Sequence, residues 1–334
     1  MWPIIEPLHL IRYLLVWKVN RKMVRLPHCL PVDLSRVLGT LIAERLPTRE
    51  AQPWRKALSK WDAYEGDAAD SRPRDRHKPR PGQPDRNTPV PQIAWPIETV
   101  LFVYPGKQIY GQGELIFWEL KLAGTSADHG LFLEVILPAM EEASTTTDPR
   151  WSHPNSLWGG FDIQSIYAAR GLHWEPVARD GKLDLRQRVP PTWWAEGRTF
   201  TSDSERALDQ LSWSTGFDLP TPPATRAPTL SQILEALTAR LSAFRPGKHL
   251  ANADVWQSLS PDDQAALRRA IEQAAEFPVV RQQIGPAPKG WPGKWGGSQK
   301  FLLIPDPIVP YLELASILHI GRQTHFGCGT FIIK

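Results

Sequence analysis

The sequence predicts an α+β protein made of two tandem ferredoxin-like domains, the first of which carries an insertion rich in proline and arginine. A length of 334 residues suits two domains. The apolar patterns of the first half follow the order strand, helix, strand, strand, helix, strand, which is the ferredoxin-like order. The second half repeats this order with one added helix, without evident sequence identity between the halves.

The first half opens with a buried strand over residues 9–19 (HLIRYLLVWKV). A helix follows, because Pro31 suits a first helical turn and apolar residues recur behind it at helical spacing. The remaining elements are expected as strands at 97–104 and 115–124, a helix at 130–143 and a strand at 160–169.

Residues 46–93 interrupt this pattern with prolines, arginines and aspartates. The second half of the segment has almost nothing to bury, so we expect it to be disordered or extended. Six lysines and arginines lie between Arg72 and Arg86. Such a cluster can bind a phosphate backbone, or it can simply be a solvated basic surface.

The second half begins after a proline- and tryptophan-rich stretch at 174–204, which we interpret as a linker. The predicted domains are therefore 1–173 and 205–334. Thr229 and Ser260 are expected helix N-caps, and Asp306 with Pro307 should open a last helix that stops at Gly321. A short strand over 330–333 should end the second sheet.

Charge and composition restrict the class of protein. The net charge is +4, and Lys18, Arg21, Lys22 and Arg25 lie within eight residues, a pattern typical of phosphate-backbone binding. No apolar run approaches the ~18 residues of a membrane span, and the N-terminus lacks the features of a signal peptide, so a cytoplasmic protein is expected. The two cysteines form neither a disulfide framework nor a zinc site. No motif for a metal or another cofactor is evident.

The C-terminal segment ELASILHIGRQTHFGCGTFII contains three closely spaced glycines, Gly321, Gly327 and Gly329, after a predicted helix. This arrangement resembles the C-terminal signature of the CRISPR repeat endoribonucleases, the Cas six group of the RAMP superfamily. The segment at 97–124 is similar to a strand–turn–strand of that family, and GKWGGSQKFLLI is a weaker match. The resemblance covers about two-thirds of the chain; residues 46–93 depart from it, since many relatives have a cysteine-containing segment there.

The resemblance implies metal-free RNA cleavage, in which the ribose 2′-hydroxyl attacks the adjacent phosphate and leaves a 2′,3′-cyclic phosphate and a 5′-hydroxyl. It suggests His28 as the acid or base, with Lys22 and Arg25 steadying the phosphate. His28 can equally be an ordinary loop histidine. The expected RNA contacts are Gly321, Arg322, His325, Gly327, Gly329, Lys18 and Arg21, and His319 is expected to cap the last helix as an imidazolium.

The implied partners are CRISPR repeat RNA and other CRISPR effector subunits. Two alternatives to the endoribonuclease stay open on the sequence. The first is a non-catalytic RAMP subunit that binds guide RNA within an effector complex. The second is a general RNA-binding module of tandem ferredoxin-like domains outside any CRISPR system.

Overall fold

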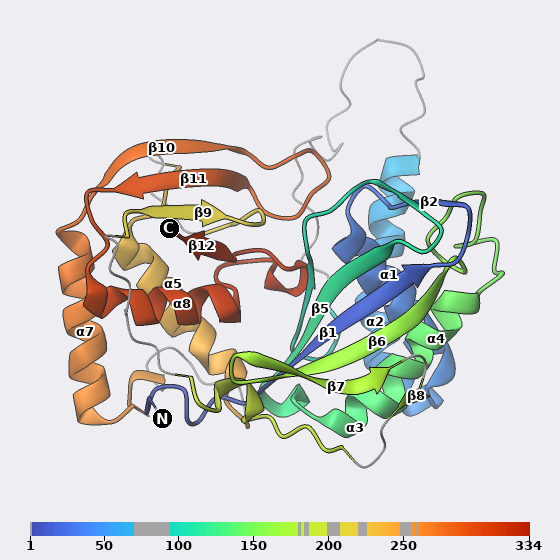
Figure 1. The fold of residues 1–334 in the computed structure, drawn as a ribbon, viewed down its shortest axis with the longest axis horizontal. Helices are drawn as coiled ribbons and strands as arrows, with labels where there is room; N and C mark the ends of the chain where they lie inside the picture. Colours follow the sequence, from blue (N-terminus) through green and yellow to red (C-terminus); the bar gives the residue numbers. More distant parts are fainter. Residues whose placement is uncertain are drawn as a thin grey trace, which may run out of the picture.

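The computed structural model describes residues 2–69, 94–179, 182–183, 187–198, 208–219, 226–247, 255–257 and 259–334. Within these residues the chain forms two large antiparallel sheets that lie side by side, each with helices packed on one face, and one small two-stranded sheet (Figure 1). We call each sheet with its helices a lobe. No described helix is long and apolar enough to cross a membrane.

The first lobe is built around β1 (Leu10–Val19), which pairs with β5 (Leu115–Ala123) on one side and β6 (Phe161–Arg170) on the other. β3 (Thr99–Val103) lies outside β5, so the core of the sheet has the order β3-β5-β1-β6. Two helices connect these strands and cover one face: α1 (Leu30–Arg45), and the helical segment that ends in α4 (Leu137–Thr145). This connectivity is the predicted ferredoxin-like one.

The second lobe repeats this arrangement. Its sheet has the order β10-β11-β9-β12, so the first and last strands again lie together in the sheet. The fold class expected from the sequence is therefore confirmed. The elements are β9 (Gln210–Trp213), α5 (Leu230–Leu241), α7 (Pro261–Ala275), β10 (Val279–Pro286), β11 (Trp295–Phe301), α8 (Val309–Leu318) and β12 (Phe331–Ile333).

Local signals placed these helices well. Thr229 accepts a hydrogen bond from the Gln232 backbone in a full capping box, and the Ser260 side chain caps α7, as predicted. The last helix differs slightly. Residues Asp306–Ile308 form a 3₁₀ turn before α8, and the helix ends at Leu318 rather than at Gly321.

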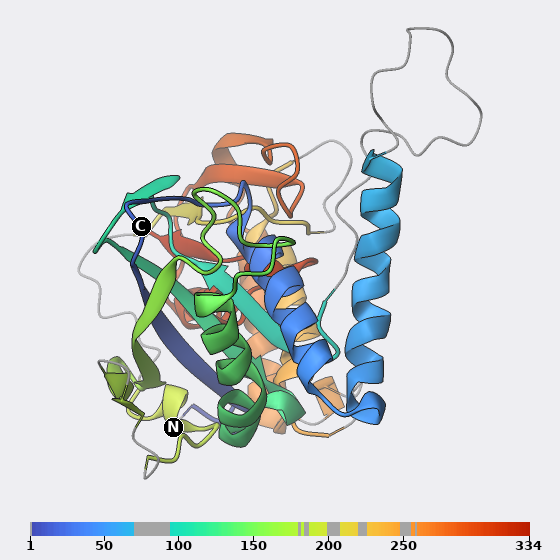
Figure 2. The ribbon, with the colours of Figure 1, turned by 90° about the vertical axis from the view of Figure 1, so that its right-hand side faces the viewer.

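One helix was missed. Residues Thr48–Ala69 form α2, which packs beside α1 and is the outermost helix of the first lobe (Figure 2). Ala51, Trp54 and Leu58 recur at helical spacing, with Trp54 buried against the first core, but the surrounding prolines and charges hid this period. The expected disordered part, residues 70–93, lies outside the described residues.

The expected linker also begins differently. β7 (His173–Arg179) pairs with β6, and the short β8 (Lys182–Leu183) follows it, so the first sheet extends by two strands. The strand was not predicted because Pro176 lies in its middle, and proline is unusual inside a strand. Pro176 lies opposite Tyr167, where the register shifts, and such an irregularity is where a sheet tolerates proline.

Smaller elements complete the first lobe. β2 (Met23–Arg25) pairs with β4 (Ile109–Gly111), and α3 (His129–Leu131) leads through a π turn over Phe132–Ile136 into α4. Ile4, Ile5 and Leu8 of the N-terminal segment are buried in the second core rather than the first. The division at 1–173 and 205–334 therefore remains a proposal.

Aromatic stacking dominates the first core. Trp17 is fully buried, stacks on Phe161 with ring centroids 4.0 Å apart, and meets Trp118 edge to face. Burial of this kind of side chain contributes several kcal/mol to a fold.

We predict that Trp17→Ala lowers the free energy of unfolding by about 3–5 kcal/mol, because it leaves a cavity between two sheet strands and their helices. Chemical denaturation measures this. Leu172→Ala, at a side chain that is 73% exposed, is the matched control and should change stability by less than ~0.5 kcal/mol. Equal losses in the two variants would contradict this role of Trp17 in the core.

Candidate functional site

His28 lies in the short loop between β2 and α1, and its side chain is exposed. It borders a cavity of about 290 Å³ at the junction of the two lobes. The cavity walls come from the loop before α1, from the turn between β3 and β4, from the β10–β11 loop and from the segment His319–Gly329, which we call the glycine loop. The lining includes Tyr104, Lys107, Tyr110, Trp291, Phe326 and Cys328.

The His28 ring is held from the other lobe. Its Nε2 atom lies 3.1 Å from the Lys289 carbonyl oxygen and 3.1 Å from the Trp291 indole nitrogen. The Trp291 ring stands edge-on to the imidazole, with centroids 5.8 Å apart. Residues more than 260 positions away in the chain therefore set the orientation of His28.

The two cations suggested beside His28 differ in position. Arg25 is exposed and lines a second groove of about 550 Å³ that also reaches His28. Lys22 is exposed in the turn before β2 and lines neither this groove nor the cavity. The structure thus brings Arg25, but not Lys22, into the same groove as His28.

The wall of this second groove carries further cations that the sequence did not single out. Two guanidinium groups lie near the centre of the Trp151 ring, that of Arg36 at 5.0 Å and that of Arg150 at 5.6 Å. Hydrogen bonds from Arg150 to Asp148 and Glu44 raise the pKa of its guanidinium. The guanidinium of Arg150 therefore keeps its positive charge, and the carboxylates of Asp148 and Glu44 balance that charge.

Lys18 and Arg21 lie at the end of β1. Lys18 is exposed and pairs through its backbone with Leu115. Arg21 is half-buried, packs over Gly159 and Gly160, and donates to Ser152 Oγ at 3.4 Å. Arg21 thus also holds the loop before β6 in place.

Lys107, Tyr104 and Tyr110 line the cavity beside His28, and the sequence analysis did not select them. Lys107 is exposed, forms an ion pair with Glu114, and lies 5.9 Å from the centre of the Tyr110 ring. Burial raises the pKa of Tyr104, whose hydroxyl donates to Glu119. A lysine in a glycine turn between two tyrosines (YPGKQIY) was the available signal.

The glycine loop packs against protein rather than facing solvent. Gly321, Gly327 and Gly329 all have positive φ angles, of 90°, 77° and 82°. A side chain at Gly327 would come within 2.8 Å of the Leu101 carbonyl oxygen. The backbone N–H groups of Gly327 and Gly329 donate to the carbonyls of Thr324 and Gly216. These two N–H groups are engaged within the protein, and the contact of Gly327 and Gly329 with RNA stays a prediction.

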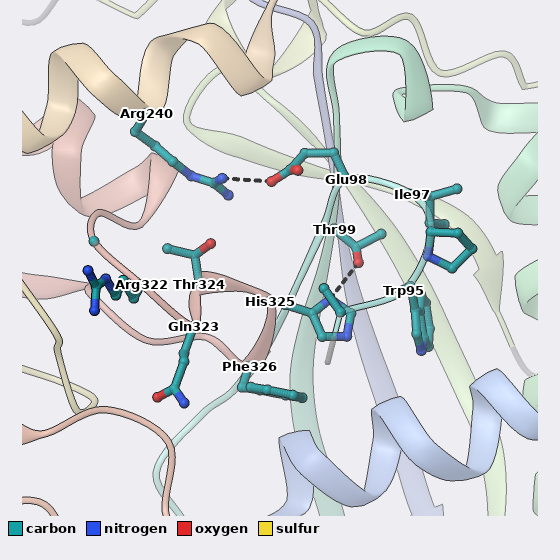
Figure 3. A pocket seen from close by; sticks show the side chains of 13 residues that line it. Trp95, Ile97, Glu98, Thr99, Arg240, Arg322, Gln323, Thr324, His325 and Phe326 are labelled. Atoms are coloured by element: carbon teal, nitrogen blue, oxygen red, sulfur yellow. Dashed lines mark hydrogen bonds and ion pairs between the residues drawn. The ribbon is translucent and has the colours of Figure 1, made fainter. Parts of the chain in front are cut away.

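His325 is buried and joins the lobes. Its Nδ1 lies 2.8 Å from Thr99 Oγ1 (Figure 3). Its Nε2 lies 2.8 Å from Ser35 Oγ, and both hydroxyls belong to the first lobe. Burial lowers the pKa of His325 to about 3, so the ring is neutral. With both nitrogens engaged, His325 bridges the lobes, and its expected contact with RNA stays a prediction.

His319 is likewise buried and neutral. Its Nδ1–H donates to the carbonyls of Gly327 and Cys328, at 3.0 and 3.1 Å. Burial, together with the nearby charge of Lys121, lowers the pKa of His319 well below its ordinary value. The expected imidazolium cap is therefore wrong, and His319 closes the glycine loop on itself.

Arg322 is the exposed cation of the glycine loop. It borders a pocket of about 630 Å³ whose opposite wall is the segment 94–99 (Figure 3). In the same pocket Arg240 is paired with Glu98 at 2.6 Å. Gly321 also lines this pocket, with Asp218 behind it.

Among the described residues, no group of three or more histidine, cysteine, aspartate or glutamate side chains is placed to hold a metal ion. Cys29 and Cys328 are free thiols at the cavity, and burial raises the pKa of both.

No family model matches the chain, and no curated protein matches it by sequence. Solved structures do match. They include a Cas6 product complex with 16% identity, covering 98% of this chain and 99% of that one, at a TM-score of 0.45. A partial Cas6-RT-Cas1–Cas2 complex matches at 11% identity, 98% of this chain and 46% of that one, at a TM-score of 0.49.

The product of a Cas6-related gene from Pyrococcus furiosus also matches, at 9% identity, 98% of both chains and a TM-score of 0.38. These structures bear the name of the group that the C-terminal segment resembles.

We predict that His325→Ala lowers the free energy of unfolding by about 1–3 kcal/mol, because Ser35 and Thr99 lose their buried partner. Equilibrium denaturation measures this. Arg322→Ala is the matched loop control and should change stability by less than ~0.5 kcal/mol. A larger effect at Arg322 than at His325 would contradict the structural role of His325.

The stability conferred by His325 should also depend on pH. Because its folded pKa of about 3 lies below the ordinary value of 6.5, the unfolded state binds the proton first as pH falls. The contribution is full above pH 6.5 and is lost progressively below it. The free energy of unfolding of the variant His325→Gln should therefore fall less steeply with decreasing pH than that of the parent protein. His319 is present in both proteins, so its contribution cancels in the comparison. Parallel slopes would argue against a buried neutral His325.

Proposed function

We propose that this protein is a metal-independent endoribonuclease that cleaves CRISPR repeat transcripts into guide RNA. The observation that carries the proposal is the position of His28, exposed at a cavity between two ferredoxin-like lobes, with Arg25 and Lys107 on the surrounding walls. The resemblance of the C-terminal segment to the repeat endoribonucleases supplies the class of substrate.

The proposed reaction needs one proton acceptor, one proton donor and a cation. The 2′-hydroxyl loses its proton as its oxygen bonds to the adjacent phosphorus; the bond to the 5′-oxygen then breaks, and that oxygen takes a proton. Histidine suits either proton transfer near neutral pH. Arg25 and Lys107 are the cations best placed to stabilise the charged phosphate in the transition state.

Further contacts would hold the RNA backbone away from the scissile phosphate. Lys18, Lys22 and Arg322 are exposed and suited to phosphates. Arg21 lies near Lys18 and Lys22 at the end of β1, whereas Arg322 borders the separate pocket beside the segment 94–99. Other CRISPR effector subunits are proposed as protein partners of the resulting RNA complex.

A non-catalytic subunit that binds guide RNA is the second candidate. The observation in its favour is that His28 Nε2 already contacts protein atoms of the other lobe. In this second candidate, His28 fastens the lobes together and transfers no proton.

Incubation of the protein with its cognate repeat RNA in EDTA separates the two. We predict cleavage that leaves a 2′,3′-cyclic phosphate and a 5′-hydroxyl. His28→Ala should lower the single-turnover rate by about 10²–10⁴-fold with little change in RNA affinity, because one proton-transfer group is lost.

His173→Ala, at an exposed histidine that begins β7, is the control and should cleave at the parent rate. Tight binding without cleavage, with no effect of His28→Ala, would favour the guide-binding subunit. Absence of repeat binding would overturn both candidates.

A further inference from the structure

The loop between β10 and β11 reaches from the second lobe to His28. Its base is fixed: the Ala287 N–H donates to the Lys294 carbonyl, and the Lys294 N–H donates to the Phe217 carbonyl. The Gly293 N–H donates to Gln323 Oε1 of the glycine loop. The tip is therefore presented from an anchored base, with Trp291 and Pro292 forming part of the cavity wall.

Two groups of this loop compete for one atom. The Lys289 carbonyl can only accept a hydrogen bond, and the Trp291 indole N–H can only donate one. Both lie 3.1 Å from His28 Nε2. When Nε2 carries a proton it can donate to Lys289, and when Nε2 is bare it can accept from Trp291, but it cannot do both.

We propose that Trp291 is a positioning residue that sets where His28 carries its proton and leaves Nδ1 as the nitrogen that meets the RNA. The indole N–H stabilises the neutral ring whose proton is on Nδ1. The Lys289 carbonyl stabilises the forms protonated on Nε2, including the imidazolium. The catalytic part of this proposal rests on the proposed function; the hydrogen bond itself does not.

Other charges surround the ring and stay in place when Trp291 is changed. Arg25 faces the groove from β2, Asp33 and Arg36 from α1, and His153 from the loop after α4. Lys107 lines the cavity from the β3–β4 turn, and Lys289 belongs to the loop itself. Trp291→Phe keeps an aromatic ring beside His28 and removes the indole N–H, so it tests this hydrogen bond with a smaller ring in place.

The direct test is ¹⁵N NMR of protein in which the ring nitrogens of all nine histidines are labelled with ¹⁵N. The signals of His28 are assigned as those that disappear in the variant His28→Gln. In Trp291→Phe the neutral His28 should shift toward the form protonated on Nε2. The pH at which the ring gains its second proton should rise by about half a unit, the size expected for one lost hydrogen bond. Unchanged His28 signals would overturn the proposal.

The pH dependence of cleavage is the second readout. In the plot of cleavage rate against pH, the part that depends on protonation of His28 should move to higher pH by the same amount. This holds whether His28 donates or accepts the proton in the reaction. Trp193→Phe, which changes an indole on the first lobe stacked under Arg170, should leave both readouts unmoved.

A shift in the NMR signals without any cleavage of repeat RNA would overturn the proposed function and retain the Trp291 contact. If Trp291→Phe unfolds early on heating, Trp291→Ala must give the same shift toward Nε2 protonation, and its failure to do so counts against the proposal.

Discussion

The close packing of the glycine loop against both lobes is the constraint on which the rest of the molecule depends. A Cβ at Gly329 would overlap the Ile320 carbonyl oxygen, and one at Gly327 would press on the backbone of β3. His325 then joins the loop to α1 and β3 through two buried hydroxyls. Because the Gln323 side chain of the same loop holds the base of the β10–β11 loop, this packing also places Trp291 at His28.

Charges reinforce the contact between the lobes. Burial alone would raise the pKa of Glu119, but Arg12 and Lys121 lower it, and Arg12 donates to its carboxylate at 2.5 Å. Lys121 donates to the Ile317 carbonyl at the end of α8, and burial lowers its pKa to about 7. Buried charges are tolerated only when they are paired, so this group favours one relative placement of the lobes over others.

Local sequence signals were sufficient for most of the fold. Strand β1, the capped helices α5 and α7 and the duplicated element order follow from apolar period and capping residues, which act over a few positions. Helix α2 and strand β7 were missed because prolines and charges in their segments outweighed a short apolar period. The burial of Trp54 against α1 is a tertiary contact that no local pattern displays.

The site divides in the same way. The loop before α1 that carries His28 and the basic segment that includes Arg25 are local features, and both were predicted. The role of the glycines was not, because positive φ serves a phosphate-binding turn and a tightly packed turn equally well. Only the partners decide between them, and those partners, Leu101 and Gly216, lie far earlier in the chain. The glycines predicted to contact RNA also fasten the lobe whose loop holds His28 Nε2. The packing of these glycines therefore fixes the positions of Trp291 and Lys289 at His28.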